Sequence, residues 1–278
     1  IQATTGATVV NVTAPNVTVI ATSNANAAVY ALNGGIINFS GNVNTTGTGL
    51  RTGVTVGWPN NTHSEVNVAG NLTATGGVGK GEVAYIWNNS LIKVDGNFVA
   101  KTTAGTRSTV RNSGSLMIGG TSLVTSSTAD GMVLGGTVNK FSGAVTVNID
   151  SAANKTGVIL LPSNSTIEFD SDLKVTTTAD NSIGVSGRVG SMTTIAGKLD
   201  VRTDGNGSIG MDQAGSITVQ GDSTVTTKGS NAIGVNTTGS GTSTFNQLTV
   251  NASGASAIGV NVGAGATSTL GSGSTVTT

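Results

Sequence analysis

The sequence predicts a right-handed parallel β-helix, a solenoid of about 10 to 11 coils of ~25 residues with three short strands per coil. Three observations predict it. A short signature recurs at near-constant spacing, apolar residues alternate with polar ones between the signatures, and 42 of the 278 residues are Gly while none is Cys. Because such repeats stack into one body, residues 1–278 are expected to form a single continuous β-helix.

The recurring signature is Ser/Ala-Ile-Gly-Val/Met. Its four clear copies contain Ile183, Ile209, Ile233 and Ile258, which follow one another at nearly equal steps. Stepping backwards at this interval reaches earlier copies at Val158, Val133 and Val110, and weaker ones near Ile86, Val54 and Val29. The near-constant step predicts one strand of each coil at these positions.

The other two strands of each coil are predicted by a pattern of alternating apolar residues around a central Gly or Ser. Segments 66–74 and 92–100 are typical, and an alternation of period two indicates strands. Gly, Thr, Val, Ser and Asn dominate, and no stripe with helical spacing is present, so helices are disfavoured. Gly and Asn at the corners are expected to supply the left-handed backbone conformations of tight turns.

Charged residues one coil apart give an independent test of this register. Outward side chains of successive coils should stack, with opposite charges next to each other. Three sets fit this expectation: Asp172, Lys198 and Asp222; Lys174 and Asp200; Asp204 and Lys228.

Composition narrows the functional classes. Thirteen Lys and Arg residues balance thirteen Asp and Glu residues, so we expect no field of one sign and no nucleic acid or other polyanion as partner. The lack of Cys excludes disulfides, thiol catalysis and Cys-ligated zinc, and we expect neither a metal nor a cofactor. No apolar run is long enough for a membrane helix, and the start at Ile1 fits a mature product or an excised fragment.

The best catalytic candidates are Glu168, Asp170 and Asp172, which alternate with apolar residues and should point outward from one strand. Carboxylates two residues apart on a strand are separated by roughly 6.6 Å at the backbone, within the range of inverting glycosidases. Against catalysis, Asp172 has a Lys neighbour in the ladder, and no long loop would wall a cleft. We therefore predict no catalytic residue, and retain a polysaccharide lyase or glycoside hydrolase as the alternative.

One interval departs from the repeat, because the step from Val54 to Ile86 is clearly longer than the others. Insertions in a solenoid form surface loops, and exposed aromatic residues in loops often contact a glycan or a protein. The interval and the strand that follows it supply the candidate binding residues, Trp58, Asn60, His63, Tyr85 and Trp87. The alternative is that Tyr85 and Trp87 fill inward positions of the core. His63 is the only histidine, which leaves no second candidate base for a serine triad.

The sequence resembles the β-helical passenger segments of type V autotransporters, the pertactin-like and self-associating adhesins of Gram-negative bacteria. The resemblance covers nearly the whole chain and rests on repeated Ile-Gly-Val units, Gly-rich turns, outward Thr, Ser and Asn, few aromatic residues and no Cys. Heads of trimeric autotransporters are also similar, but their coils are much shorter than the repeat of this chain.

The resemblance implies a non-catalytic rod on the bacterial cell surface, or a secreted one, with a role in adhesion and virulence. Its partners would be a host-cell receptor or glycan, or copies of itself on neighbouring cells. The family implies export through the outer membrane and a C-terminal β-barrel, which this sequence does not include. A chain that stops at Thr278, inside an eleventh coil, is expected to be a fragment of a longer passenger.

Overall fold

The computed structural model describes residues 1–4, 8–21, 26–47, 49–57, 62–76, 81–102, 104–105, 107–150, 152–163 and 166–278. Within these residues the chain forms strands and turns and contains no helix. It follows that no helix in the described part is long and apolar enough to cross a membrane.

One strand of each coil belongs to sheet A, in which all 11 strands pair in parallel and in sequence order. These strands are β1 (Gln2–Ala3), β4 (Ala27–Ala31), β7 (Thr52–Val56), β10 (Ala84–Ile86), β13 (Ser108–Asn112), β16 (Asp130–Gly136), β19 (Thr156–Ser163), β22 (Ile183–Gly187), β25 (Ile209–Gln213), β27 (Ile233–Thr237) and β29 (Ile258–Val262).

The other 20 strands form sheet B, which consists of two parallel series. The first series contains β2 (Val9–Val12), β5 (Ile36–Phe39), β8 (Glu65–Val68), β11 (Leu91–Val94), β14 (Ser115–Ile118), β17 (Val138–Phe141), β20 (Ile167–Phe169), β23 (Met192–Ile195) and β30 (Thr267–Leu270). The second contains β3 (Asn16–Ile20), β6 (Asn42–Thr46), β9 (Leu72–Gly76), β12 (Phe98–Thr102), β15 (Ser122–Ser126), β18 (Val145–Ile149), β21 (Leu173–Thr177), β24 (Leu199–Thr203) and β31 (Thr275–Thr277). Two long strands, β26 (Ser216–Lys228) and β28 (Thr242–Ser253), run through both series.

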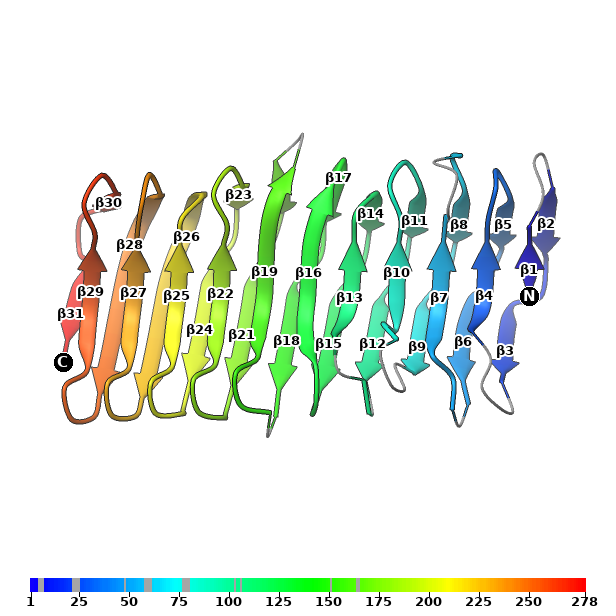
Figure 1. Cartoon of the computed structure of the whole chain (residues 1–278). Coiled ribbons are helices and arrows are strands. Elements are labelled where there is room, and N and C mark those ends of the chain that lie inside the picture. Colours follow the sequence, from blue (N-terminus) through cyan, green and yellow to red (C-terminus); the bar gives the residue numbers. More distant parts are fainter. Residues whose placement is uncertain are drawn as a thin grey trace.

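The coils advance along one axis, so the molecule is a rod (Figure 1). Strands of sheet A lie in front and run upward, and the chain then descends behind them through sheet B while the coils progress from right to left (Figure 1). This path is a right-handed winding, the hand expected of parallel crossovers. The structure therefore confirms the predicted parallel β-helix.

The core consists of columns of like side chains, because parallel in-register pairing places equivalent residues above one another. Phe141 pairs with Phe169, and their rings stack at a centroid distance of 5.0 Å and an interplanar angle of 9°. Both side chains are buried. Val175 and Val201 form a similar column in the second series of sheet B.

The Gly of the signature is required by the close approach of sheet A to sheet B. A Cβ atom on this Gly would lie 2.3 to 2.4 Å from a Val Cγ1 atom of sheet B, a distance that real Cβ atoms do not reach. The four Gly–Val pairs are Gly184 with Val201, Gly210 with Val225, Gly234 with Val250, and Gly259 with Val276. The signature Gly thus lies where sheets A and B approach each other closely.

Asn residues occupy left-handed conformations at the corners, as the sequence predicted. Five Asn residues and one Ser have φ between 49° and 59°, a region that Asn tolerates better than most residues. They are Asn33, Asn89, Asn154, Asn181, Asn231 and Ser256.

The predicted register is correct in the C-terminal coils and for Val29 with Val54, and it slips by one or two residues in the coils between them. Ile183, Ile209, Ile233 and Ile258 pair in succession, as predicted. By contrast, Val158 pairs with Val185, Val133 pairs with Ile159, and Ile86 pairs with Val56. The number of residues per coil varies, so a constant step along the sequence places some residues one or two positions away from their true partners.

Candidate binding site: a groove on sheet A

The outward face of sheet A changes in chemistry along the rod. One row of outward side chains runs through successive strands by in-register pairing. From β4 to β19 the row reads Tyr30, Thr55, Tyr85, Arg111, Val133 and Ile159. From β22 to β29 it continues as Ser186, Asp212, Asn236 and Asn261. In this row, aromatic, cationic and apolar residues therefore occur only in the earlier coils.

Two adjoining cavities lie along this earlier part of the row. The first has a volume of about 430 Å³ and the second about 580 Å³, and both are lined by Tyr85 and Arg107. Other residues of the first cavity include Tyr30, Arg51, Glu82 and Trp87. Other residues of the second include Arg111, Asp130, Ile159 and Arg188. We refer to these ten residues as the sheet A groove.

An aromatic pair lies at the centre of the groove. The rings of Tyr85 and Trp87 have centroids 4.8 Å apart and are tilted by 37°. Both side chains are partly exposed, whereas Ala84 and Ile86 on the same strand point inward and are buried. The alternative that Tyr85 and Trp87 fill the core is therefore wrong, because alternation on β10 assigns the inward positions to Ala84 and Ile86. Burial raises the pKa of Tyr85, so its hydroxyl is neutral near pH 7.

Positive charge is concentrated in the groove. Arg51, Arg107, Arg111 and Arg188 line the two cavities, and they are four of the five arginines in the sequence. The fifth, Arg202, lies on sheet B and pairs with Asp204 at 2.9 Å. A chain without net charge thus carries a local excess of guanidinium groups on one face.

One buried carboxyl group, Glu82, and one half-buried carboxyl group, Asp130, accompany these arginines. The Glu82 side chain is 4% exposed, and its Oε1 atom lies 3.8 Å from Arg107 and has no hydrogen-bond partner among the described residues. Burial raises the pKa of Glu82, while the charges of Arg107, Arg111 and Arg51 act in the opposite direction. Burial also raises the pKa of Asp130, whose Oδ1 atom accepts the Thr156 backbone N–H at 2.8 Å.

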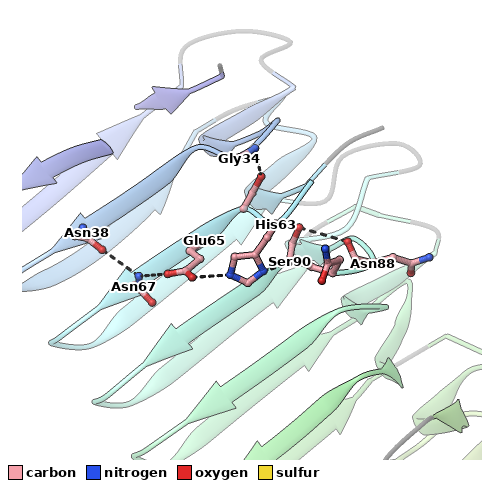
Figure 2. A network of polar contacts seen from close by, with 9 residues as sticks. Gly34, Asn38, His63, Glu65, Asn67, Asn88 and Ser90 are labelled. Carbon is pink, nitrogen blue, oxygen red and sulfur yellow. Dashed lines mark hydrogen bonds and ion pairs between the residues drawn. The ribbon is translucent and has the colours of Figure 1, made fainter. Parts of the chain in front are cut away.

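His63 lies in a separate network that begins at the start of β8 (Figure 2). Its Nδ1 is 2.7 Å from the Asn89 carbonyl oxygen, and its Nε2 is 2.6 Å from Glu65 Oε1. Glu65 Oε2 in turn accepts a hydrogen bond from Asn67, which also donates to Asn38 in the preceding coil.

This network favours the charged imidazolium, because both ring nitrogens face acceptors. The hydrogen bond to Glu65 is the main cause of a raised pKa of His63, and the hydrogen bond from Asn67 is the main cause of a lowered pKa of Glu65. His63 connects β8 to the turn that contains Asn89 and does not line the groove. The arrangement is that of a structural ion pair.

The structure therefore divides the predicted binding residues. Tyr85 and Trp87 lie in the groove, His63 lies elsewhere, and Trp58 and Asn60 lie outside the described residues. Sequence reasoning missed the four arginines, Glu82 and Asp130. A usable signal existed, because Arg111 occupies the outward position next to Tyr85 once the coils are aligned correctly.

The acidic strand of the enzyme alternative is neutralised by a lysine of the preceding coil. Lys140 Nζ lies 3.1 Å from Glu168 Oε2 and 3.3 Å from Asp170 Oδ2, and these hydrogen bonds, the one to Glu168 first, raise the pKa of Lys140. Asp172 Oδ1 accepts the Lys198 backbone N–H at 2.8 Å. None of the three carboxylates lines either cavity of the groove.

Comparisons with known protein families, with curated proteins and with solved structures find no match. The strand pairing alone therefore identifies the fold as a parallel β-solenoid. Any function must be argued from the surface chemistry of that solenoid.

Proposed function

We propose that the protein is a non-catalytic adhesin rod of the autotransporter passenger type, displayed at a bacterial cell surface, and that it contacts its partner through the sheet A groove. The observation that carries the proposal is the concentration of the Tyr85–Trp87 pair and four arginines around two adjoining cavities of one face. Aromatic residues and arginine are the residue types most enriched at the energetic centres of binding surfaces.

The regular part of the rod supports a scaffold role. From β25 to β29 the outward row of sheet A is a ladder in which Asn236 donates to Asp212 at 2.8 Å and Asn261 donates to Asn236 at 2.7 Å. Eleven coils at ~4.8 Å per coil give a rod of roughly 50 Å. A stiff rod of this kind holds a binding groove away from its attachment point.

The alternative function is that of a β-helical polysaccharide lyase or glycoside hydrolase acting through Glu168, Asp170 and Asp172. It has less support because Lys140 holds the first two carboxylates in ion pairs. The side chains of Glu168 and Asp170 are also 46% and 42% exposed, without the burial that tunes a general acid.

Adhesion by cells that display the protein tests the proposal. We expect such cells to clump or to bind host cells, and the Tyr85→Ala/Trp87→Ala double variant to lose most of this adhesion at equal surface density. Arg202→Ala, outside the groove, is the control and should adhere like the wild type. Adhesion no higher than that of cells without the rod would refute the proposal, as would cleavage of a polysaccharide that Asp170→Asn abolishes.

A further inference from the structure

The arginines of the groove lack close carboxylate partners among the described residues. Arg111 and Arg188 form no ion pair among the described residues, and Arg107 has only the loose contact of 3.8 Å with Glu82. Within the part of the chain that the structure describes, Arg51 donates a single long hydrogen bond of 3.5 Å, to Asn26. Guanidinium groups without carboxylate partners bind carboxylate or sulfate groups in a bidentate manner.

The arginines are spread along the rod and are not gathered at one point. Arg51 precedes β7 and Arg188 follows β22, and the strand order places five coil steps between these two strands. At ~4.8 Å per step this separation is about 24 Å. A ligand that reaches all four arginines must therefore be extended along the sheet.

The remaining groups of the groove fit a sugar chain. The partly exposed Tyr85–Trp87 pair offers flat apolar faces of the kind that pack against sugar rings. Glu82 Oε1, which has no hydrogen-bond partner among the described residues, is an acceptor placed for a hydroxyl group. Sugars provide many hydroxyl groups, so this oxygen would gain its missing bond.

Charge density distinguishes a sugar chain from a nucleic acid. Four arginines share the groove with two carboxyl groups, Glu82 and Asp130. A nucleic acid strand carries a phosphate about every 3.4 Å, and carboxylates in the binding face would repel it. A polysaccharide with more widely spaced acid groups and intervening hydroxyl groups matches the mixture better.

From these observations we infer that the sheet A groove binds an extended acidic polysaccharide, with arginines taking its carboxylate or sulfate groups and the Tyr85–Trp87 pair taking a sugar face. This inference rests on the proposed adhesin function and names the chemical class of the partner. It departs from the expectation of no polyanionic partner, which was drawn from zero net charge, because folding separates the charges that composition averages.

Calorimetric titration of the purified chain tests the inference with defined probes. Dextran sulfate and polygalacturonate supply sulfate and carboxylate groups respectively, and uncharged dextran is the matched control for the first. We expect binding of at least one acidic polymer, weakening with added salt, and none of dextran. Equal binding of dextran and dextran sulfate, absence of binding to both acidic polymers, or tighter binding of single-stranded DNA would overturn the inference.

Variants locate the site. Arg107→Ala/Arg111→Ala should weaken binding of the acidic polymer about tenfold, whereas Arg202→Ala should leave it unchanged. Arg111→Lys, which keeps the charge but loses the bidentate geometry, should bind more tightly than Arg107→Ala/Arg111→Ala and less tightly than the wild type. Circular dichroism checks that each variant folds. Equal affinity of the double variant and the wild type would place any binding outside the groove and contradict the inference.

Competition by the acidic polymers in the adhesion assay separates this inference from the proposed function. If displayed cells adhere through the Tyr85–Trp87 pair but neither acidic polymer competes, the ligand class is wrong and the adhesin function stands. If displayed cells do not adhere at all, the function fails, whatever the purified chain binds.

Discussion

The coils that begin with β22 and the coils from β7 to β19 share one architecture and differ in regularity. In the C-terminal coils, Ile183, Ile209 and Ile233 follow one another at nearly equal steps, and the outward row of sheet A is polar. In the earlier coils, Val54 pairs with Ala84 across a longer step, and Val110 pairs with Met132 across a shorter one.

The difference shows which positions of a coil are free to change. Inward columns are apolar in both regions, because each coil must continue the core of its neighbours. Turns and outward positions carry no such constraint. The groove has therefore formed where turn length varies, and the polar ladder has formed where it does not.

Removal of an inward aromatic residue should have the largest effect, and the same effect in both regions. Phe98→Ala in the earlier coils and Phe245→Ala in the later ones should each lower the free energy of unfolding by about 3–5 kcal/mol, because both rings are buried. Urea denaturation measures this, with Thr244→Ala as control. A large loss for only one of the two would mean that the regions do not share one kind of core.

The signature Gly offers a second test, confined to the regular region. Gly210→Ala should cost about 1–3 kcal/mol, since its Cβ would lie 2.4 Å from Val225 Cγ1 and 2.6 Å from the Gly234 carbonyl oxygen. At Gly263 the nearest atom would be 3.6 Å away, so Gly263→Ala should change stability by less than about 0.5 kcal/mol. Similar losses for both would show that close approach is not the reason for the signature Gly.

Glu82→Gln should stabilise the groove region at neutral pH, by on the order of 1 kcal/mol. Burial raises the pKa of Glu82, so its favourable contribution is complete below the pKa of an unfolded Glu and is lost as pH rises through the higher folded pKa. The gain from the substitution should therefore be present at pH 7 and absent near pH 3. Thermal melts at both pH values measure it.

Glu168→Gln serves as the control, because this exposed carboxylate pairs with Lys140 and should change stability by less than about 0.5 kcal/mol. A Glu82→Gln variant that melts earlier than the wild type at pH 7 would mean that the arginines of the groove outweigh burial.

The smallest effect concerns His63, which belongs to neither the groove nor the regular ladder. Its pKa is raised mainly by Glu65, so the stability it adds is complete below the unfolded pKa and is lost as pH rises through the folded one. Because the ring is half exposed, the amount is a few tenths of a kcal/mol. NMR titration of this single histidine should give a pKa above 6.5 that Glu65→Gln lowers. No change on substitution would exclude Glu65 as the cause.

The fold and part of the site could be predicted from the sequence. Parallel stacking makes equivalent residues contact each other, so the repeat itself identified the register of Ile183 with Ile209 and the pair of Lys174 and Asp200, which lie 3.6 Å apart. Tyr85 and Trp87 were predicted as binding residues because they follow an insertion, and they do line a cavity.

The rest of the site depends on side chains that meet only when coil lengths are known. The constant step places Val133 opposite Val158, whereas Val158 pairs with Met132 across a slightly longer step. A similar slip of two residues hides the alignment of Arg111 with Tyr85. Lys140 was likewise not recognised as the neighbour of Glu168, which lies one coil further on. Composition could not help, since it reports equal numbers of charges and not their positions.

Adhesion of cells that display two matched pairs of substitutions in the same outward row of sheet A shows whether the groove contacts the partner. The Tyr85→Ala/Arg111→Ala pair alters the groove, and the Asp212→Ala/Asn236→Ala pair alters the polar ladder. At equal surface density, we expect the first pair to lower adhesion about tenfold and the second to leave it unchanged. Equal adhesion by both, or a greater loss for the ladder pair, would contradict the claim that the groove contacts the partner.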